Sequence, residues 1–289
     1  MYTILVTGAS GFVGCRFIRR WESEYHILAP SHSELDITSD ISVEHFFAVH
    51  RPSVVLHLAA ISNTWYCEQH PDESRTVNVE GAVRVARAAA SCGAKFVFFS
   101  SDQIYNGNLQ TGPLCEDVAV APETVYARDK LLAEQLIANV CPDAVMLRAT
   151  WMYDADISGL PLHANFVSNI SRAIDEHKSI FFPVREYRGI TWVREVVEYL
   201  PHTFLLPAGV YNFGAQNRLN TYETACCYIE MMDCGRACDT IVVADAERFT
   251  EHERNIAISN EKVFQASGGY ICFSDTVDGL RFFLASQKQ

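Results

Sequence analysis

The sequence predicts an α/β protein with a doubly wound parallel sheet, followed by a smaller α/β cap. Short apolar runs alternate with helical patterns as far as residue 148, which is typical of a parallel sheet covered by helices on both faces. Beyond residue 150 this alternation weakens, and short strands mix with helices. We therefore expect a sheet domain over residues 1–150 and a substrate-binding cap over residues 151–289, with some segments of the cap returning to the sheet.

The chain opens on a strand that runs directly into a glycine-rich turn. Residues 2–7 are apolar, and Gly8, Gly11 and Gly14 follow before an apolar helical pattern begins. Glycines in such a turn let the backbone approach a pyrophosphate, and the N-terminus of the next helix offers unpaired N–H groups. The spacing G-x-x-G-x-x-G differs from the usual G-x-G-x-x-G, and an ordinary βα turn is the alternative. The stretch predicts a Rossmann-type dinucleotide-binding site.

The second predicted strand, residues 25–30, ends without an acidic residue. In sites that prefer NAD, a carboxylate near this point binds the ribose 2′-hydroxyl. Here Ser31 and His32 follow the strand, and the first carboxylate is that of Glu34. A carboxylate repels a 2′-phosphate and a hydroxyl does not, so we expect NADP(H), with Ser31 at the cofactor. No arginine is present here to bind the phosphate, so NAD(H) stays possible.

The remaining elements of the first half continue the alternation. We expect helices over residues 42–50, 72–92 and 126–140, strands over residues 53–58, 95–100 and 144–148, and a loop over residues 105–122. After the third strand, the small residues Ala59 and Ala60 would let a flat cofactor lie against the backbone. His57, inside that strand, is interpreted as a core histidine.

The second half carries weaker signals. We expect helices over residues 165–177, 193–204, 221–232 and 276–286, and strands over residues 210–213 and 240–244. We find no internal repeat and no low-complexity linker, so the cap is expected to be built onto the sheet domain rather than tethered to it.

Composition excludes several classes of function. The 289 residues carry a net charge of −12, whereas proteins that bind nucleic acids or anionic membranes need a basic face. No apolar run reaches the length of a membrane span, and the first 20 residues lack the features of a signal peptide. We expect a cytoplasmic protein with neither nucleic acid nor membrane as a partner.

The 10 cysteines are scattered along the chain, and without a signal peptide we expect reduced thiols. Cys226, Cys227, Cys234 and Cys238 lie close together in sequence. No C-x-x-C pair occurs among them, so we expect neutral thiols rather than a metal site.

Tyr126 and Lys130 form the main chemical pair. Residues four apart share one face of a helix, so the phenol and the ammonium can enter the same site. A phenol has a pKa near 10, and a neighbouring ammonium lowers it toward the working range. The preceding strand ends in Ser100-Ser101, where a hydroxyl could hold a substrate carbonyl. Such a spacing is common by chance, so the interpretation depends on its place after the fourth strand.

Motifs in this order resemble the extended short-chain dehydrogenase/reductases. They are Thr7-Gly8-x-x-Gly11-x-x-Gly14, Leu58-Ala59-Ala60, Asn78-Val79-x-Gly81, Ser100-Ser101-Asp102 and Tyr126-x-x-x-Lys130. Within that superfamily the chain most resembles the dTDP-4-dehydrorhamnose reductases, through residues 35–38, 101–107, 147–153, 165–167 and 189–193. The resemblance runs nearly end to end, through Glu253-Arg254-Asn255 and the last helix.

The resemblance implies a role for each matching position. It implies that Gly8, Gly11 and Gly14 shape the pyrophosphate turn, with N–H groups from Phe12 and Val13, and that Asp36 and Ile37 lie at the adenine. It also implies that Leu58, Ala59 and Ala60 line the cofactor, and that Asn78 belongs to the cofactor site by steadying the helix beside the active site. It implies that Ser101 binds the substrate carbonyl, that Tyr126 donates the proton, and that Lys130 binds the nicotinamide ribose and lowers the pKa of Tyr126. Asp102 and Trp151 would lie at the sugar of a nucleotide-sugar substrate, and a homodimer is possible.

Two departures from these reductases stand out. Asp129 precedes Lys130 where relatives usually have a small residue, and residues 154–163 do not follow the pattern of the family. Three functions remain open. The first is an NADP(H)-dependent reductase of a nucleotide-linked 4-keto sugar. The second is an epimerase or dehydratase of the same superfamily, which Gln103 disfavours because a dehydratase has glutamate there and an amide is no base. The third is a non-catalytic cofactor-binding regulatory subunit, such as that of methionine adenosyltransferase.

Overall fold

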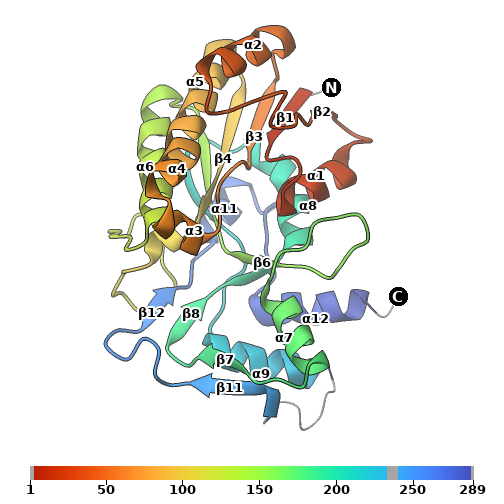
Figure 1. The fold of residues 1–289 in the computed structure, drawn as a ribbon, viewed down its shortest axis with the longest axis vertical. Coiled ribbons are helices and arrows are strands. Elements are labelled where there is room, and N and C mark those ends of the chain that lie inside the picture. Colours follow the sequence, from red (N-terminus) through yellow and green to blue (C-terminus); the bar gives the residue numbers. More distant parts are fainter. Residues whose placement is uncertain (1–2, 233–239, 288–289) are drawn as a thin grey trace.

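The fold is organised around a six-stranded parallel sheet in the order β10-β5-β4-β3-β1-β2 (Figure 1). The computed structural model describes residues 3–232 and 240–287. The strands of this sheet are β1 (Thr3–Thr7), β2 (His26–Leu28), β3 (Val54–His57), β4 (Lys95–Ser101), β5 (Val145–Ala149) and β10 (Gly209–Phe213). The predicted α/β class with a parallel sheet is confirmed. The strand order reverses between β1 and β3, and in such sheets a ligand binds at that point.

Helices cover both faces of the sheet, because successive side chains of each strand point to opposite sides. Ile4 and Val6 pack with α1 (Phe12–Trp21) and α8 (Val193–Thr203). Leu5 faces the opposite layer, which consists of α2 (Asp40–His50), α5 (Ala82–Cys92) and α6 (Val125–Val140). Figure 1 shows these two layers on either side of the strands. β10 and α8 thus belong to the sheet domain although they come from the second half of the chain.

The helix predicted over residues 72–92 is interrupted. Two short helices, α3 (Thr64–Gln69) and α4 (Pro71–Arg75), lead into a π-helical turn, η1 (Thr76–Gly81), before α5 begins. In this wide turn Asn78 is buried, and its side chain accepts a hydrogen bond from the Ile61 N–H at 2.8 Å and donates one to the Ile61 carbonyl at 3.0 Å. Such turns inside helices are often found at functional sites.

Pairs of very short parallel strands build much of the cap. They are β6 (Trp151–Tyr153) with β9 (Ile190–Trp192), β7 (Ile180–Pro183) with β11 (Val242–Asp245), and β8 (Glu186–Arg188) with β12 (Arg254–Ile256). The helices α7 (Phe166–Asp175), α9 (Thr221–Met231) and α12 (Thr276–Ser286) pack around these strands, and α11 (Glu261–Ala266) contacts β10. Strands of three or four residues are too short for a reliable alternation pattern, which explains why most of them are missed from sequence.

Within the described residues, no helix combines the length and the apolar character that crossing a bilayer requires. The cysteines described by the structure are free thiols. Cys234 and Cys238, part of the cysteine group considered from sequence, lie outside the described residues. Across residues 3–232 and 240–287, no group of three or more His, Cys, Asp or Glu side chains is placed to hold a metal ion.

Candidate active site

A cavity of about 940 Å³ lies along the C-terminal edge of the sheet, with one wall from the sheet domain and the other from the cap. Most of the predicted site residues line it, namely Gly8, Gly11, Phe12, Val13, Gly14, Leu58, Ala60, Ser101, Asp102, Tyr126, Lys130 and Trp151. The structure therefore brings the glycine turn, the end of β4 and the start of α6 to one site.

The glycine turn is closely packed. Gly8 has a φ of +70°, and a Cβ there would lie 2.7 Å from the Ala59 nitrogen. A Cβ on Gly14 would lie 2.4 Å from the Gly8 oxygen, so both positions require glycine. No side chain caps α1 at Gly11, and Phe12 and Val13 of its first turn line the cavity. An uncapped helix N-terminus at a glycine turn fits the pyrophosphate of a dinucleotide.

Ser101 and Tyr126 meet where β4 ends and α6 begins. Ser101 is the last residue of β4, and its hydroxyl accepts a hydrogen bond from the Gln103 N–H at 3.2 Å. Tyr126 lies in the first turn of α6, which Thr124 caps by accepting a hydrogen bond from the Ala127 N–H. The Ser101 hydroxyl lies close enough to the Tyr126 hydroxyl to lower its pKa. One substrate oxygen at this point could therefore contact both.

The pKa of Tyr126 does not follow the expectation from sequence. Burial raises it above 10, the charge of Asp102 adds to this increase, and the Ser101 hydroxyl opposes it. The predicted lowering by Lys130 is not found, because the Lys130 Nζ lies 5.8 Å from the centre of the Tyr126 ring and donates to the Phe99 carbonyl. A raised pKa keeps the phenol protonated at neutral pH, as a proton donor requires.

Lys130 is buried behind Tyr126. Its Nζ donates to the Phe99 carbonyl at 2.8 Å and lies 4.7 Å from the centre of the Phe98 ring. Burial lowers the pKa of Lys130 to about 8, against the opposing charge of Glu134. The pKa of nearby His57 falls to about 3, also through burial, so this histidine is neutral. Of Lys130 and His57, Lys130 is therefore the residue that is positively charged at neutral pH.

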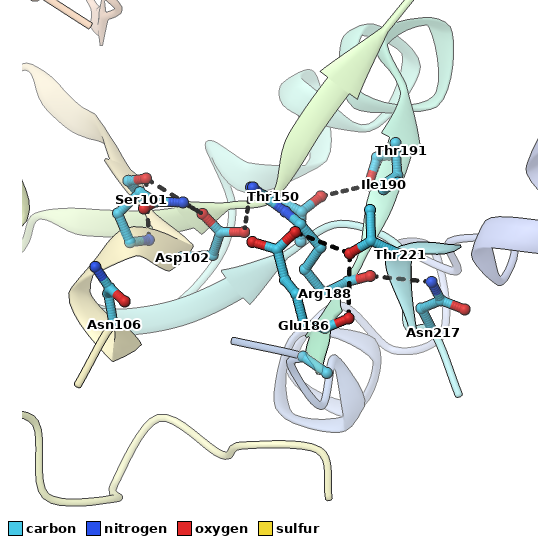
Figure 2. A network of polar contacts seen from close by, with 12 residues as sticks. Ser101, Asp102, Asn106, Thr150, Glu186, Arg188, Ile190, Thr191, Asn217 and Thr221 are labelled. Atoms are coloured by element: carbon cyan, nitrogen blue, oxygen red, sulfur yellow. Dashed lines mark hydrogen bonds and ion pairs between the residues drawn. The ribbon is translucent and has the colours of Figure 1, made fainter. Parts of the chain in front are cut away.

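Asp102 stands at the centre of a polar network that joins the sheet domain to the cap (Figure 2). The carboxylate is buried, which raises its pKa, and the charges of Arg188 and Arg254 oppose this increase. Arg188 donates to Asp102 at 3.3 Å and lies 5.0 Å from the centre of the Trp151 ring. Arg254 pairs with Glu186 and donates to the Gln103 side chain at 2.7 Å.

Arg188 and Arg254 both line the cavity, and neither received a role from sequence. A weak signal existed for each, since Arg188 precedes a stretch that resembles the reductases and Arg254 lies within one. His163, Asn165 and Ser62 to Thr64 also line the cavity without having been predicted. They come from the loops that precede α3 and α7 and from the first residue of α3, and the positions of these loops depend on long-range contacts.

Other predicted cofactor residues lie away from the cavity lining. Ser31 is exposed, and its N–H and hydroxyl both donate to the Glu34 carboxylate, at 2.8 and 2.7 Å. The Glu34 carboxylate therefore lies beside Ser31, although the sequence predicted that the first carboxylate after this strand would be too far along the chain to act there. The Asp36 carboxylate accepts two hydrogen bonds from Thr38. Ile37 packs in the core with α2 and α5.

Asp129, the unusual neighbour of Lys130, is hydrogen-bonded to the short helix α4. Its carboxylate accepts a hydrogen bond from Ser74 at 2.6 Å, and the Asn78 amide donates to the same Ser74 hydroxyl at 3.1 Å. Because Asn78 also binds Ile61, this chain connects α6 to the loop after β3. Asp129 thus braces the segment packed against α6, and its charge still raises the pKa of Lys130 against the lowering by burial.

Comparisons with known proteins agree with this arrangement. The chain is 28% identical over 231 residues to the spore coat polysaccharide biosynthesis protein SpsK of Bacillus subtilis, covering 80% of this chain and 79% of that protein. It is 30% identical over 219 residues to a dTDP-4-dehydrorhamnose reductase of Streptomyces griseus, covering 72% and 69%. Among solved structures, a dTDP-4-dehydrorhamnose reductase of Bacillus anthracis in complex with NADP superimposes with a TM-score of 0.84 at 23% identity, over 99% of both chains.

A family model described as the RmlD substrate binding domain matches residues 2–268, which is nearly the whole chain. Relatives of this chain bear the name dTDP-4-dehydrorhamnose reductase. The family resemblance inferred from the motifs is confirmed. The chain belongs to the RmlD substrate binding domain family, among the NAD(P)-dependent oxidoreductases of the extended short-chain dehydrogenase/reductase superfamily.

Proposed function

We propose that the protein is an NADP(H)-dependent reductase of a nucleotide-linked 4-keto sugar, with NAD(H) as a possible second cofactor. The observation that carries the proposal is the placement of Ser101, Tyr126 and Lys130 in the cavity that also contains the glycine turn. Relatives named dTDP-4-dehydrorhamnose reductase support the substrate class. The Bacillus anthracis structure with NADP and a Bordetella bronchiseptica structure with NAD support the two cofactors.

The residues of the chain divide between holding the cofactor and handling the substrate oxygen. When bound, the nicotinamide supplies the hydride that reduces the carbonyl carbon. Gly8, Gly11 and Gly14 would hold the pyrophosphate at the N-terminus of α1. Lys130, which is buried and lines the cavity, would bind the hydroxyls of the nicotinamide ribose.

Ser101 and Tyr126 would hold the substrate carbonyl oxygen between their hydroxyl groups. Tyr126 would then give its proton to that oxygen as negative charge develops there, and Ser101 would keep the oxygen in place. The raised pKa of Tyr126 supports this direction of transfer, because the phenol is protonated before the reaction. Trp151 and Asp102 line the same cavity and would contact the sugar.

The surroundings of Gln103 disfavour the dehydratase alternative. Its side-chain oxygen accepts a hydrogen bond from Arg254 at 2.7 Å, and its nitrogen donates to Asp102 at 3.3 Å. Both ends of the amide are therefore engaged, and an amide cannot act as the base that a dehydratase needs.

Oxidation of NADPH and of NADH across a panel of nucleotide-linked keto sugars tests the proposal. We expect turnover with a 4-keto sugar and none with the corresponding 4-hydroxy sugar under the same conditions. Binding of the reduced cofactor should be measured in parallel. A protein that binds the cofactor but oxidises it with no keto sugar of the panel would support the non-catalytic regulatory alternative instead.

A further inference from the structure

A buried ion pair fastens the loop between β6 and α7 to the first helix of the sheet domain. The Arg16 Nε donates to the Asp154 carboxylate at 2.6 Å, and both side chains are at most 7% exposed. The other oxygen of Asp154 accepts a hydrogen bond from the Trp192 indole at 3.2 Å. The same Arg16 donates to the Pro161 carbonyl at 3.0 Å. Both ends of the loop formed by residues 154–164, called here the strap, are therefore tied to α1.

Arg16 also fixes the residue that begins α1. It donates to the Phe12 carbonyl at 3.0 Å, and its guanidinium lies 4.1 Å from the centre of the Phe12 ring. Phe12 lies within the glycine turn, and Arg16 lies one helical turn after Phe12. One buried side chain thus connects the strap to the first turn of the helix at which a pyrophosphate would bind.

The C-terminal end of the strap lines the cavity. The ring of His163 lies 6.2 Å from the ring of Phe12, centre to centre, and His163 lines the same cavity as Gly11 and Phe12. Asn165 directly follows the strap and is buried, and its amide donates hydrogen bonds to the carbonyls of Asp154 and His163. Because Asn165 also caps α7, the position of His163 is set from both sides.

From this geometry we propose that the strap completes the cofactor site, and that His163 contacts the cofactor pyrophosphate opposite the glycine turn. This inference rests on the proposed function, since it requires a dinucleotide in the cavity. The imidazole brings a hydrogen-bond donor from the cap to a phosphate held by backbone N–H groups of α1. The Arg16–Asp154 pair keeps that donor in place. Residues 154–163 depart from the pattern of the reductases, so no role for them follows from the resemblance.

Direct measurement of dinucleotide affinity tests the strap without any substrate. The probes are NADPH, NADH and ADP-ribose, which carries the pyrophosphate but no nicotinamide. Asp154→Asn removes the ion pair, and Asp156→Asn is its matched control. Asp156 lies in the same strap and is exposed, so its substitution changes the loop charge equally but leaves Arg16 paired. His163→Ala removes the proposed contact, and His45→Ala on the outer face of α2 is its control.

We expect Asp154→Asn and His163→Ala each to lower the affinity for all three probes by about tenfold, which corresponds to one charge-assisted hydrogen bond. Asp154→Asn should also speed cofactor release. Loss of NADPH binding without loss of ADP-ribose binding would overturn the contact, because it would place the effect at the nicotinamide. Equal affinities for Asp154→Asn and Asp156→Asn would overturn the role of the ion pair.

Asp154→Asn leaves Arg16 buried without its partner, so this variant could unfold. The double variant Arg16→Met/Asp154→Leu removes both charges and avoids that penalty. It should fold, as judged by thermal unfolding, and should still bind the three probes about tenfold more weakly. Affinities equal to those of the wild type would overturn the proposal. If the wild-type protein binds none of the probes, the proposed function fails together with this inference, whereas unchanged variants of a binding-competent wild type overturn the strap alone.

Discussion

Arg188 of the cap reaches the end of β4 and donates to the carboxylate of Asp102 at 3.3 Å. Asp102 follows Ser101 directly, and its charge raises the pKa of Tyr126. The carboxylate is buried, and an uncompensated buried charge is costly. The pair therefore does two things. It joins the cap to the sheet domain, and the charge of Arg188 opposes the increase in the pKa of Asp102 that burial causes.

Removing this guanidinium should destabilise the fold in a pH-dependent way. For Arg188→Gln we expect a loss of about 3–5 kcal/mol in the free energy of unfolding at neutral pH, because Asp102 stays buried with less compensation. The pKa of Asp102, already raised, should rise further. A raised pKa favours the protonated form in the folded state, so the loss should shrink as the pH falls and Asp102 binds a proton.

Denaturant unfolding from neutral to acidic pH measures this difference. Arg172→Gln, which replaces an exposed arginine on α7, is the control and should change little. A loss that stays constant across the pH range would show that Asp102 is not the group involved.

Tyr126→Phe tests the proposed proton donor. The substitution removes one oxygen and keeps the packing of the ring at the start of α6. We expect catalysis to fall by about 10²–10⁴, the usual contribution of a positioned acid, while cofactor affinity hardly changes. Steady-state kinetics together with direct cofactor binding give both values. A variant that keeps most of its activity would remove Tyr126 from the mechanism.

Much of the site could be predicted because it depends on local sequence. The glycine turn is read from a strand followed by three glycines, and Tyr126 with Lys130 from a spacing of four on one helix. The pKa of Tyr126 could not be predicted, because it depends on burial and on Asp102, whose position is set by another element. His163 and Arg188 were missed for the same reason, since each reaches the cavity through contacts with distant residues.

Prediction of the fold is limited in the same way, because elements that depend on long-range contacts leave no local signal in the sequence. The long strands of the sheet carry continuous apolar runs, so their existence follows from the sequence. β8 and β12 have three residues each, and they are held by pairing with one another and by the contact of Arg254 with Glu186. No periodic pattern fits within three residues. The shorter β2 has a local cause, because Pro30 closely follows it and lacks the N–H group that a ladder requires.

Lys130 should give the reaction an upper pH limit. Burial lowers its pKa to about 8, so the ammonium that would bind the ribose is lost as the pH rises through that value. We expect kcat/KM, which reports groups of the free enzyme, to fall above about pH 8. Lys130→Met should weaken cofactor binding and turnover and should abolish this limb of the profile. A limb that persists in Lys130→Met belongs to another group.

The same shift predicts a stability effect with a defined sign. The pKa of Lys130 is lower in the folded protein than its ordinary value of 10.5, so between about 8 and 10.5 the unfolded chain binds more protons at this residue. Lys130 therefore makes the fold more stable as the pH rises through that window. Unfolding of Lys130→Met should lack this contribution, whereas unfolding of Lys178→Met, which replaces an exposed lysine, should retain it.

The last prediction concerns Glu34 and the choice between NADPH and NADH. The sequence favours NADPH because no acid directly follows β2, but in the structure the Glu34 carboxylate accepts hydrogen bonds from the N–H and hydroxyl of Ser31. These bonds lower the pKa of Glu34, so it is charged at neutral pH. If the adenine ribose lies at the end of β2, the carboxylate repels a 2′-phosphate there.

Glu34→Gln should then tighten NADPH binding by about fivefold and leave NADH binding nearly unchanged. Glu22→Gln, at an exposed glutamate just after α1, is the control. An equal change for both cofactors would place the 2′-phosphate away from Glu34, and the wild-type ratio of kcat/KM for the two cofactors would then be set by other residues.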